Sequence, residues 1–478
     1  MTKALVGLDV GTTGVKAVAL SLDGTLLGRA EHGYPLSTPR PGWAEQDPED
    51  WWRASEGALA ELAVEPVAIG LSGQMHGLVA LDEHDRVLRP AILWNDQRTR
   101  EETREIEARV GAERLLELTG NPALTGFTAP KLLWLRRHEP ETYARIRHVL
   151  LPKDYVRLRL TTERAIDVAD ASGTLLFDVG GRRWSEAMLE ALELPAEWLP
   201  QALESPEVSG ETADGAAVAA GAGDQAASAI GVGVIDPGTT AVTIGTSGVV
   251  FAPQPAFTPE PRGRLHVFCH AVPGRWHAMG VMLSAAGSLR WFRDAFAPGE
   301  PFERLVAEAE AVEPGAEGVT FLPYLSGERT PHADPDARAA FVGLAASHGR
   351  GVLVRAVLEG VAYGLRDSLE LLVGLGERPV SARVSGGAAR STLWLRIVAS
   401  VLGIPLERPG VEEGAAFGAA LLGGVAGGAY ASVAEAVDAA VTIRDVVEPD
   451  PEWAKAYAGS YERFRALYPA LRSASTGA

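Results

Sequence analysis

A glycine–threonine turn near the start of the chain is the first feature that could carry chemistry. Asp9 stands before Gly11-Thr12-Thr13-Gly14, and Lys16 follows. Glycine lets the backbone approach a phosphate closely, successive N–H groups form a nest for an anion, and threonine hydroxyls add donors. Lys16 could reach a phosphate as a point charge, and Asp9 could hold magnesium through water. An ordinary tight hairpin with a surface aspartate explains the same residues about as well.

The same kind of turn returns about half a chain later. Gly245-Thr246-Ser247-Gly248 offers the same donors, and short apolar runs flank it on both sides, as they flank the first turn. Either turn alone is a weak sign. Together they could hold a polyphosphate from two sides, one from each of two related domains, because a repeat of half the chain length indicates duplication.

A pair of glycines forms a third candidate. Gly386-Gly387-Ala388 follows a predicted strand over 383–385 and precedes a helix start. Paired glycines at this place would let a flat group such as adenine lie against the backbone. A simple strand-to-helix turn is the alternative.

The fourth candidate is a carboxylate at the start of a predicted helix. Asp224 follows Ala222-Gly223 and precedes Gln225. A carboxylate here can accept a proton from a substrate hydroxyl, and it can also cap the helix, a position that aspartate favours. The stretch 221–226 fits the dinucleotide pattern G-x-G-x-x-A, which we discount because no βαβ unit with a ribose-binding acid follows it.

A polar segment after another predicted strand could bind a sugar. Gln74-Met75-His76-Gly77 places two hydrogen-bonding side chains around a methionine, next to glycine. A sugar site needs such polar groups on a shaped apolar wall. A loop with a merely exposed histidine is the alternative.

Other patterns in the sequence mainly exclude classes of site and of protein. His266, Cys269, His270 and His277 are metal-ligand types at close spacing, and His266 and His270 would share one face of a strand. Without a second cysteine pair we do not expect a structural zinc site. The chain has no Gly-Lys dipeptide and therefore no P-loop, and it lacks the H-R-D and D-F-G motifs of protein kinases.

The elements that must position these residues alternate between strands and helices, which indicates an α/β protein. Around the first turn the pattern predicts a β-meander, with Asp23-Gly24 as its second turn. The expected strands cover 4–9, 15–20, 25–29, 67–71, 240–244, 249–252, 265–271 and 383–385, and the expected helices cover 48–62, 99–110, 225–230 and 349–372.

Bulk properties narrow the class of protein. A chain of 478 residues is long enough for two or three domains. The net charge of −18 argues against nucleic acid and anionic membranes as partners. The single cysteine, Cys269, excludes an internal disulfide and suits a reducing cytoplasm, and no apolar run is long enough for a membrane span. We expect a cytoplasmic protein, and a homodimer is left open.

The chain resembles the superfamily of actin, Hsp70 and sugar kinases in having two Gly-Thr hairpins that could bind phosphates and a Gly-Gly turn that could bind adenosine. Within it, the chain resembles the FGGY carbohydrate kinases, in segments that run in order from near the start to about residue 420. The matching segments are Gly42-Trp43-Ala44-Glu45-Gln46-Asp47-Pro48, Gln74-Met75-His76-Gly77, Ile92-Leu93-Trp94-Asn95-Asp96, Phe127-Thr128-Ala129-Pro130-Lys131-Leu132, Leu151-Pro152-Lys153-Asp154-Tyr155, Gly223-Asp224 and Leu322-Pro323-Tyr324-Leu325-Ser326-Gly327-Glu328-Arg329-Thr330-Pro331-His332.

The resemblance implies two ribonuclease-H-like α/β domains around a central cleft. Residues 1–236 would bind mainly the sugar and residues 237–478 mainly ATP. It implies Asp224 as the catalytic base, Met75 with His76 as substrate-binding residues, and Asp9 as the acid associated with magnesium and the phosphates. Gln225 stands where the family often has asparagine, and Ala388 where it often has a third glycine, a change of one methyl group that should still admit adenosine.

The activity that the resemblance implies is transfer of the ATP γ-phosphoryl, with Mg²⁺, to the 5-hydroxyl of D-xylulose in pentose catabolism. Such a transfer needs positioning and charge stabilisation more than covalent help. Two alternatives stay open: a kinase for another ketose or polyol, such as ribulose or ribitol, and a non-catalytic ATP switch of the actin or Hsp70 kind. A switch of this kind needs no binding site for a substrate hydroxyl. The chain offers residues for such a site, which argues against the switch: Gln74, Met75, His76 and Asp224.

Overall fold

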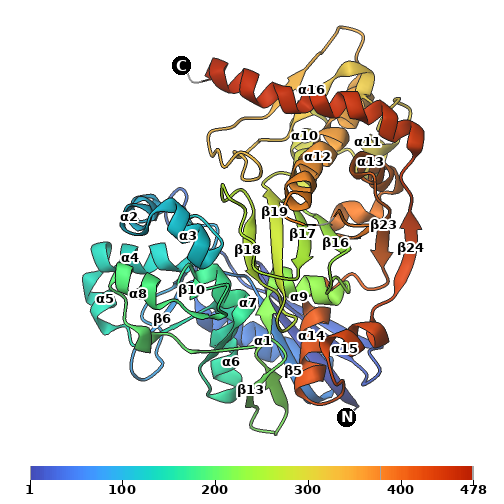
Figure 1. Cartoon of the computed structure of the whole chain (residues 1–478). Coiled ribbons are helices and arrows are strands. Elements are labelled where there is room, and N and C mark those ends of the chain that lie inside the picture. The colour runs from blue at the N-terminus through green and yellow to red at the C-terminus, as the bar shows by residue number, and fades with distance from the viewer. Residues whose placement is uncertain (1, 377, 476–478) are drawn as a thin grey trace.

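The computed structural model describes residues 2–376 and 378–475, which form two α/β halves that each contain a seven-stranded sheet (Figure 1). The first sheet has the order β13-β14-β5-β1-β2-β3, with β15 beside β5. Its strands are β1 (Lys3–Val10), β2 (Gly14–Leu20), β3 (Leu26–Gly33), β5 (Glu65–Gly73), β13 (Val208–Glu211), β14 (Ala217–Ala219) and β15 (Ala222–Gly223).

The second sheet has the order β18-β19-β17-β16-β22-β23-β24. Its strands are β16 (Thr239–Ile244), β17 (Gly248–Gln254), β18 (His266–Cys269), β19 (Trp276–Met282), β22 (Ser381–Ser385), β23 (Leu406–Pro409) and β24 (Ile443–Val447).

The two sheets repeat one arrangement. In the first, β1 pairs antiparallel with β2 and parallel with β5, which in turn pairs parallel with β14. In the second, β16 pairs antiparallel with β17 and parallel with β22, which pairs parallel with β23. The duplicated, two-domain α/β fold is therefore confirmed, and each Gly-Thr turn joins the first two strands of its sheet.

The strands form from short apolar runs of the sequence, and turn residues separate one run from the next. Leu5, Val6 and Leu8 of β1 are fully buried, as a central strand covered on both faces requires. Several boundaries differ from expectation by a few residues. The third strand of the meander extends to Gly33, and β18 ends at Cys269, so His270 lies outside it.

Helices cover both sheets. The helix α1 begins after Asp47, whose side chain accepts from the N–H of Glu49, and it ends at Leu62 as predicted. The larger helices are α1 (Pro48–Leu62), α6 (Pro152–Thr161), α9 (Asp224–Gly231), α10 (Ala286–Phe296), α12 (Arg350–Val373), α13 (Thr392–Leu402), α14 (Gly414–Ala426) and α16 (Pro451–Ser475).

Smaller elements complete the described chain. The further helices are α2 (Arg100–Val110), α3 (Ala112–Thr119), α4 (Thr128–His138), α5 (Pro140–Arg145), α7 (Val168–Ala171), α8 (Glu186–Leu192), α11 (Phe302–Glu310) and α15 (Val433–Ala440), with 3₁₀ turns η1 (Ser172–Thr174), η2 (Ala196–Trp198), η3 (Ala316–Gly318) and η4 (Gly387–Arg390). Two-stranded pairs are β4 (Glu45–Gln46) with β7 (Ala91–Ile92), β6 (Val79–Leu81) with β8 (His148–Leu150), β9 (Ala165–Asp167) with β12 (Gln201–Leu203), β10 (Phe177–Asp178) with β11 (Arg183–Trp184), and β20 (Thr320–Leu322) with β21 (Ala340–Val342).

One late helix packs on the first sheet. Although α14 follows most of the second sheet in sequence, it lies against β1, β5 and α9, low in Figure 1 beside β5. Glycines allow this close approach, because a Cβ on Gly70 would lie 1.6 Å from the Ala419 carbonyl oxygen and one on Gly418 would lie 1.9 Å from that of Ala227. A boundary near residue 236 thus remains a prediction, since the chain crosses back to the first half after it.

An apolar cluster joins the two halves. Met75 and Phe127 from the first half pack in the same cluster as Phe251, Phe268 and Met279 from the second sheet. The sugar segment predicted from sequence is therefore built against the edge of the second sheet. Among the described helices, none is both long and apolar enough to cross a membrane.

Candidate active site

The first Gly-Thr turn connects β1 to β2 and leaves backbone donors free. Its first residue, Gly11, donates to the Gly14 carbonyl oxygen at 3.1 Å, which closes the hairpin. In the part of the chain that the structure describes, the N–H groups of Thr12 and Thr13 donate to no protein acceptor. Lys16 faces Asp9 across the two strands, and its side chain is exposed. The turn therefore offers N–H groups and a cation to an anion.

The second turn has the same property. Gly245 donates to the Ser247 carbonyl oxygen at 3.0 Å, and no protein acceptor among the described residues takes the N–H of Thr246 or Ser247. The carbonyl groups of the turn are used differently. Those of Gly245 and Thr246 accept from the backbone just before and within α10, which fixes the turn against the start of that helix.

The hydroxyl of Thr12 is not free. It donates to the Gln74 side chain at 3.3 Å and accepts from the Trp94 indole at 3.0 Å. The Gln74 amide nitrogen donates to the Gly11 carbonyl oxygen at 3.2 Å and to Gln46 at 2.9 Å. Gln74 thus holds the first hairpin in shape. Its amide hydrogens are used inside the protein, so the expected direct contact of Gln74 with a sugar is not supported by its geometry.

Two carboxylates lie at one edge of the first sheet. Asp9 pairs with Ser72 of β5, and the same Ser72 pairs with Ala222 of β15, two residues before Asp224. Because β1, β5 and β15 are parallel, their carboxyl ends meet at this edge. The Ser72 hydroxyl donates to Asp9 at 3.1 Å. The alternative reading of Asp224 as a helix cap is wrong, since Gly223 is the capping residue and Asp224 is the first residue of α9.

The environment of these carboxylates makes them hard to ionise together. Burial raises the pKa of Asp9, against the opposing effects of the Ser72 hydrogen bond and the Lys16 charge. Burial, and next the negative charge of Asp9, raise the pKa of Asp224 to about 7. A carboxylate with a pKa near neutrality is suited to accept a proton in catalysis. Backbone and side-chain hydrogen bonds from Gln225 lower the pKa only in part.

The carboxylates also fit the needs of magnesium. Mg²⁺ is commonly held by one or two carboxylates and completes its coordination with phosphate oxygens and water. Asp9 and Asp224 supply that kind of donor beside the free N–H groups of the first turn. No group of three or more His, Cys, Asp or Glu residues within residues 2–376 and 378–475 is arranged as a protein-only metal site.

Met75 and His76 form the wall next to Asp224. Met75 packs against Gly223, where a Cβ would lie 2.7 Å from the methionine Cγ. His76 has a φ of +68°, a conformation that a residue other than glycine rarely adopts and that recurs at functional sites. Its Nδ1 lies 2.7 Å from the Gly173 carbonyl oxygen, which leaves Nε2 as an acceptor.

Buried groups hold the strained turn at His76. The ammonium group of Lys131 donates to the carbonyl oxygens of His76 and Gly126, each at 2.7 Å, and the Thr128 hydroxyl donates to that of His76 at 3.1 Å. Burial, followed by the charge of Lys131, lowers the pKa of His76 to about 3. His76 is therefore neutral near pH 7. Its free Nε2 can accept a hydrogen bond from a ligand, and the ring brings no charge to the site.

The histidines of the second sheet have separate partners. His266 Nδ1 lies 2.8 Å from the Asn121 oxygen, and its Nε2 lies 3.4 Å from the Arg329 guanidinium. His270 instead contacts the Val234 carbonyl oxygen and the N–H of Val272. The expectation that His266 and His270 share a strand face does not hold, because the strand ends before His270. Asn121 lies outside every motif found in the sequence, and Arg329 stands in a segment that matches the family without a predicted role of its own.

The Gly-Gly turn lies against the second hairpin. Gly386 has a φ of +89°, and a Cβ there would lie 2.6 Å from the Ile244 carbonyl oxygen and 3.0 Å from the Gly245 nitrogen. Only glycine fits so close to the hairpin. Gly387 faces open space, since nothing lies within 4 Å of its Cβ position.

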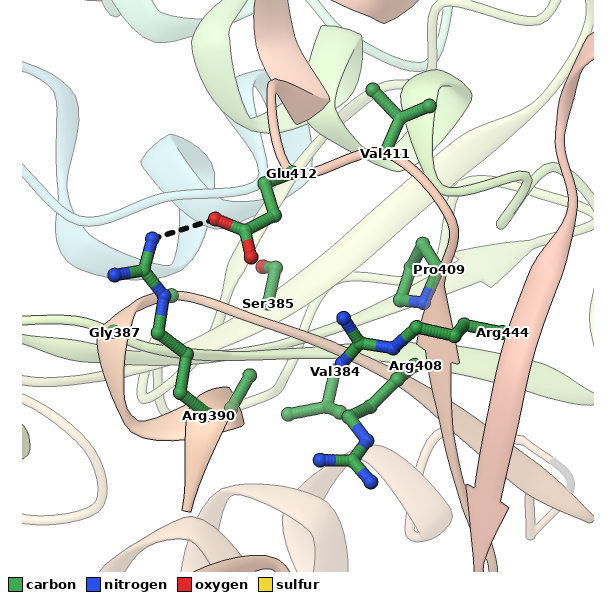
Figure 2. A pocket seen from close by; sticks show the side chains of 11 residues that line it. Val384, Ser385, Gly387, Arg390, Arg408, Pro409, Val411, Glu412 and Arg444 are labelled. Carbon is green, nitrogen blue, oxygen red and sulfur yellow. Dashed lines mark hydrogen bonds and ion pairs between the residues drawn. The ribbon is translucent and has the colours of Figure 1, made fainter. Parts of the chain in front are cut away.

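Two cavities flank this turn. The larger, of about 560 Å³, lies between the turn and α10–α11 and is lined by Gly387 and Ala388 together with Ala286, Leu289, Phe302 and Val306. The smaller, of about 210 Å³, lies on the side of β23 and β24 and is rich in arginine (Figure 2). There Arg390 pairs with Glu412 at 2.7 Å and Arg408 with Asp445 at 2.5 Å. The helix residues of the larger cavity carry no sequence signal, since they are ordinary apolar helix positions.

Comparison with known proteins agrees with this architecture. Residues 4–237 match the N-terminal domain, and residues 240–427 the C-terminal domain, of the FGGY family of carbohydrate kinases. A xylulose kinase from Escherichia coli K12 is 44% identical over 98% of this chain and 99% of its own length.

Solved structures share the whole fold. The crystal structure of a "xyloylose kinase" from Brucella ovis has a TM-score of 0.93 at 42% identity, covering 98% of this chain and 99% of its own. That of a xylulose kinase from Rhodospirillum rubrum has a TM-score of 0.92 at 33% identity, with coverage of 98% and 99%. With both domain models matched along most of its length, the chain belongs to the FGGY family of carbohydrate kinases.

Proposed function

We propose that the protein transfers the γ-phosphoryl group of ATP to the 5-hydroxyl of D-xylulose. The observation that carries the chemistry is Asp224, a carboxylate whose pKa is raised to about 7 beside Asp9 and at the edge where the first hairpin leaves its N–H groups free. The choice of sugar is supported by the xylulose kinases that resemble the chain along its length.

In this proposal the two hairpins hold the polyphosphate. The free N–H groups of Thr12, Thr13, Thr246 and Ser247, with Lys16, stabilise negative charge on the transferred group. The adenosine occupies the cavity of about 560 Å³, where Gly387 and Ala388 offer backbone and α10–α11 offer apolar side chains. The smaller cavity is less suited to adenine because its arginines are already paired with carboxylates.

Asp224 accepts the proton of the attacking hydroxyl. Met75 supports the sugar beside Asp224, and His76 offers Nε2 as a hydrogen-bond acceptor to a second hydroxyl. Asp9, with Asp224 nearby, would hold Mg²⁺, which supplies charge neutralisation of the phosphate oxygens when bound. Asp9 would also keep the hydroxyl of Ser72 directed toward the site.

The test is sugar-dependent ADP formation by the purified protein. We expect ADP from ATP only when D-xylulose is added, and a higher kcat/KM for D-xylulose than for D-ribulose, ribitol or xylitol. A higher kcat/KM for one of the other sugars would overturn the substrate. ADP formation that does not depend on any sugar would overturn the kinase activity and favour an ATP switch.

A further inference from the structure

Arg329 is placed beside the sugar wall by a fixed backbone. The segment 328–330 lies along β19 beyond the first residue of β18. There the Thr330 N–H donates to the Val281 carbonyl oxygen and the Val281 N–H donates to the Thr330 hydroxyl, both at 3.0 Å. The Glu328 side chain accepts from the N–H groups of Leu283 at 2.9 Å and Arg329 at 2.8 Å. The backbone that carries Arg329 is therefore fixed to the second sheet by hydrogen bonds.

Its guanidinium group forms no ion pair with a carboxylate in the described part of the chain, and the hydrogen bond found for it joins Nη1 to His266 Nε2 at 3.4 Å. Burial lowers the pKa of Arg329, and the charge of Glu328 opposes this effect only in part. Glu328 is adjacent, but its Oε1 is used by two N–H groups, and burial raises its pKa to about 8. Keeping a partly buried cation without a carboxylate is costly unless a ligand supplies acceptors.

The surroundings of Arg329 belong to the sugar site. The Phe127 ring contacts His76 and His266, at 4.7 and 5.9 Å between ring centroids, and the positive charge of Arg329 contributes to lowering the pKa of both imidazoles. His266 is oriented by Asn121, so its Nε2 accepts from Arg329. Arg329 thus lies beside His266, which packs on the Phe127 ring that also contacts His76.

The chemistry of a ketopentose gives this cation a partner. In the furanose form of a 2-ketopentose, the 5-oxygen is part of the ring and cannot be phosphorylated. Only the open-chain form has a free 5-hydroxyl, and that form has a free carbonyl at C2. A carbonyl oxygen is an acceptor without a hydrogen, and a guanidinium group is a donor only, so the two are complementary.

We propose that Arg329 donates to the C2 carbonyl oxygen of the open-chain ketose and so makes the site selective for ketoses over polyols. This inference rests on the proposed function. Asp224 takes the hydroxyl at one end of the sugar, His76 accepts from a hydroxyl along it, and Arg329 binds the carbonyl toward the other end. A polyol has a hydroxyl in place of the carbonyl, with tetrahedral geometry and a hydrogen that must find its own acceptor.

The test compares D-xylulose with xylitol, which has the same carbon chain without the carbonyl. For Arg329→Met we expect kcat/KM for D-xylulose to fall about 10–100-fold, the range for loss of a hydrogen bond to a charged group. The value for xylitol, or its inhibition constant where it is not turned over, should change less than about threefold. The ratio of the two then falls at least about tenfold, while KM for ATP stays within about twofold.

The controls separate this role from folding and from the proposed function. Arg275→Met removes an arginine that precedes β19 and pairs with exposed Asp236, and it should leave the ratio unchanged. Arg329→Lys keeps the charge but loses the planar fork, and we expect it to fold and to show a reduced ratio. Equal losses for both sugars, or an unchanged ratio in both Arg329 variants, would overturn the inference. A wild-type protein inactive on D-xylulose would instead overturn the proposed function.

Discussion

The carboxylate of Asp9 helps to raise the pKa of Asp224 to about 7, although the two residues are far apart in sequence. They meet because β1 and β15 both border β5 and point their carboxyl ends the same way. Burial is the larger cause of the shift, and the neighbouring charge adds to it. The arrangement gives one carboxylate for charge and one that can take a proton near neutral pH.

Replacing Asp224 with asparagine removes the proton acceptor while keeping the size of the side chain. For Asp224→Asn we expect kcat to fall about 10²–10⁴-fold, the usual contribution of a general base. Binding of D-xylulose, followed by calorimetry, should remain within a few-fold of wild type. The matched control is Asp236→Asn, which removes an exposed carboxylate soon after the same helix and should keep normal turnover. Near-normal turnover of Asp224→Asn would exclude it as the base.

The dependence of kcat/KM on pH should report the same group. Asp224 works as the carboxylate, so kcat/KM should fall about tenfold per pH unit below pH 7, where it is protonated. In Asp9→Asn the repulsion from Asp9 is lost, so ionised Asp224 becomes easier to form and its pKa falls. The acidic limb should then move to lower pH while staying above the usual aspartate value, because burial remains. A limb that stays in place or moves upward would contradict the coupling.

Much of this architecture could be predicted from sequence because its signals are local. The two hairpins, the strands beside them and α1 have turn residues, apolar runs and a capping aspartate within a few positions. The packing of α14 on the first sheet could not be predicted in this way. It depends on glycines at Gly70 and Gly418 that meet backbone far away in sequence.

The residues of the site also fall into two groups, those that local sequence patterns predict and those that depend on distant segments. Asp9, Asp224 and the hairpins stand in patterns whose chemistry is readable from residue types. The use of the Thr12 hydroxyl and the Gln74 amide inside the protein could not be predicted, because it depends on Trp94 and Gln46 in other segments. Arg329 stands in a segment that matches the family, but only its three-dimensional neighbours show that, among the described residues, no carboxylate pairs with it.

The close contact between Gly386 and the second hairpin predicts a selective effect on nucleotide binding. In Gly386→Ala the new Cβ would press on the Ile244 carbonyl oxygen and the Gly245 nitrogen, in addition to the strain of a φ of +89°. We expect KM for ATP to rise at least about tenfold, a loss of roughly 1.4 kcal/mol, with KM for D-xylulose nearly unchanged.

Gly428→Ala is the matched control for Gly386→Ala. Gly428 also has a positive φ, of +74°, but nothing lies within 4 Å of its Cβ position. Gly428→Ala should lose about 1–2 kcal/mol of stability from the left-handed conformation alone, without a change in KM for ATP. Equal KM values for ATP in the two variants would show that the contact with the hairpin does not shape the nucleotide site.

The close contact between α9 and α14 predicts that a glycine-to-alanine substitution in α14 destabilises the protein, whereas the same substitution at an exposed position of α16 does not. A Cβ at Gly418 would lie 1.9 Å from the Ala227 carbonyl oxygen, so Gly418→Ala must push the helices apart and should destabilise the protein by about 3 kcal/mol. Gly459 lies exposed within α16, where the nearest atom to its Cβ position is 4.0 Å away. Gly459→Ala should therefore stabilise its helix by up to about 1 kcal/mol. Thermal unfolding monitored by circular dichroism would decide: the melting temperature should fall for Gly418→Ala and stay level or rise for Gly459→Ala. A melting temperature unchanged by Gly418→Ala would mean that α9 and α14 can separate without loss, and the close contact between these two helices would then not stabilise the fold.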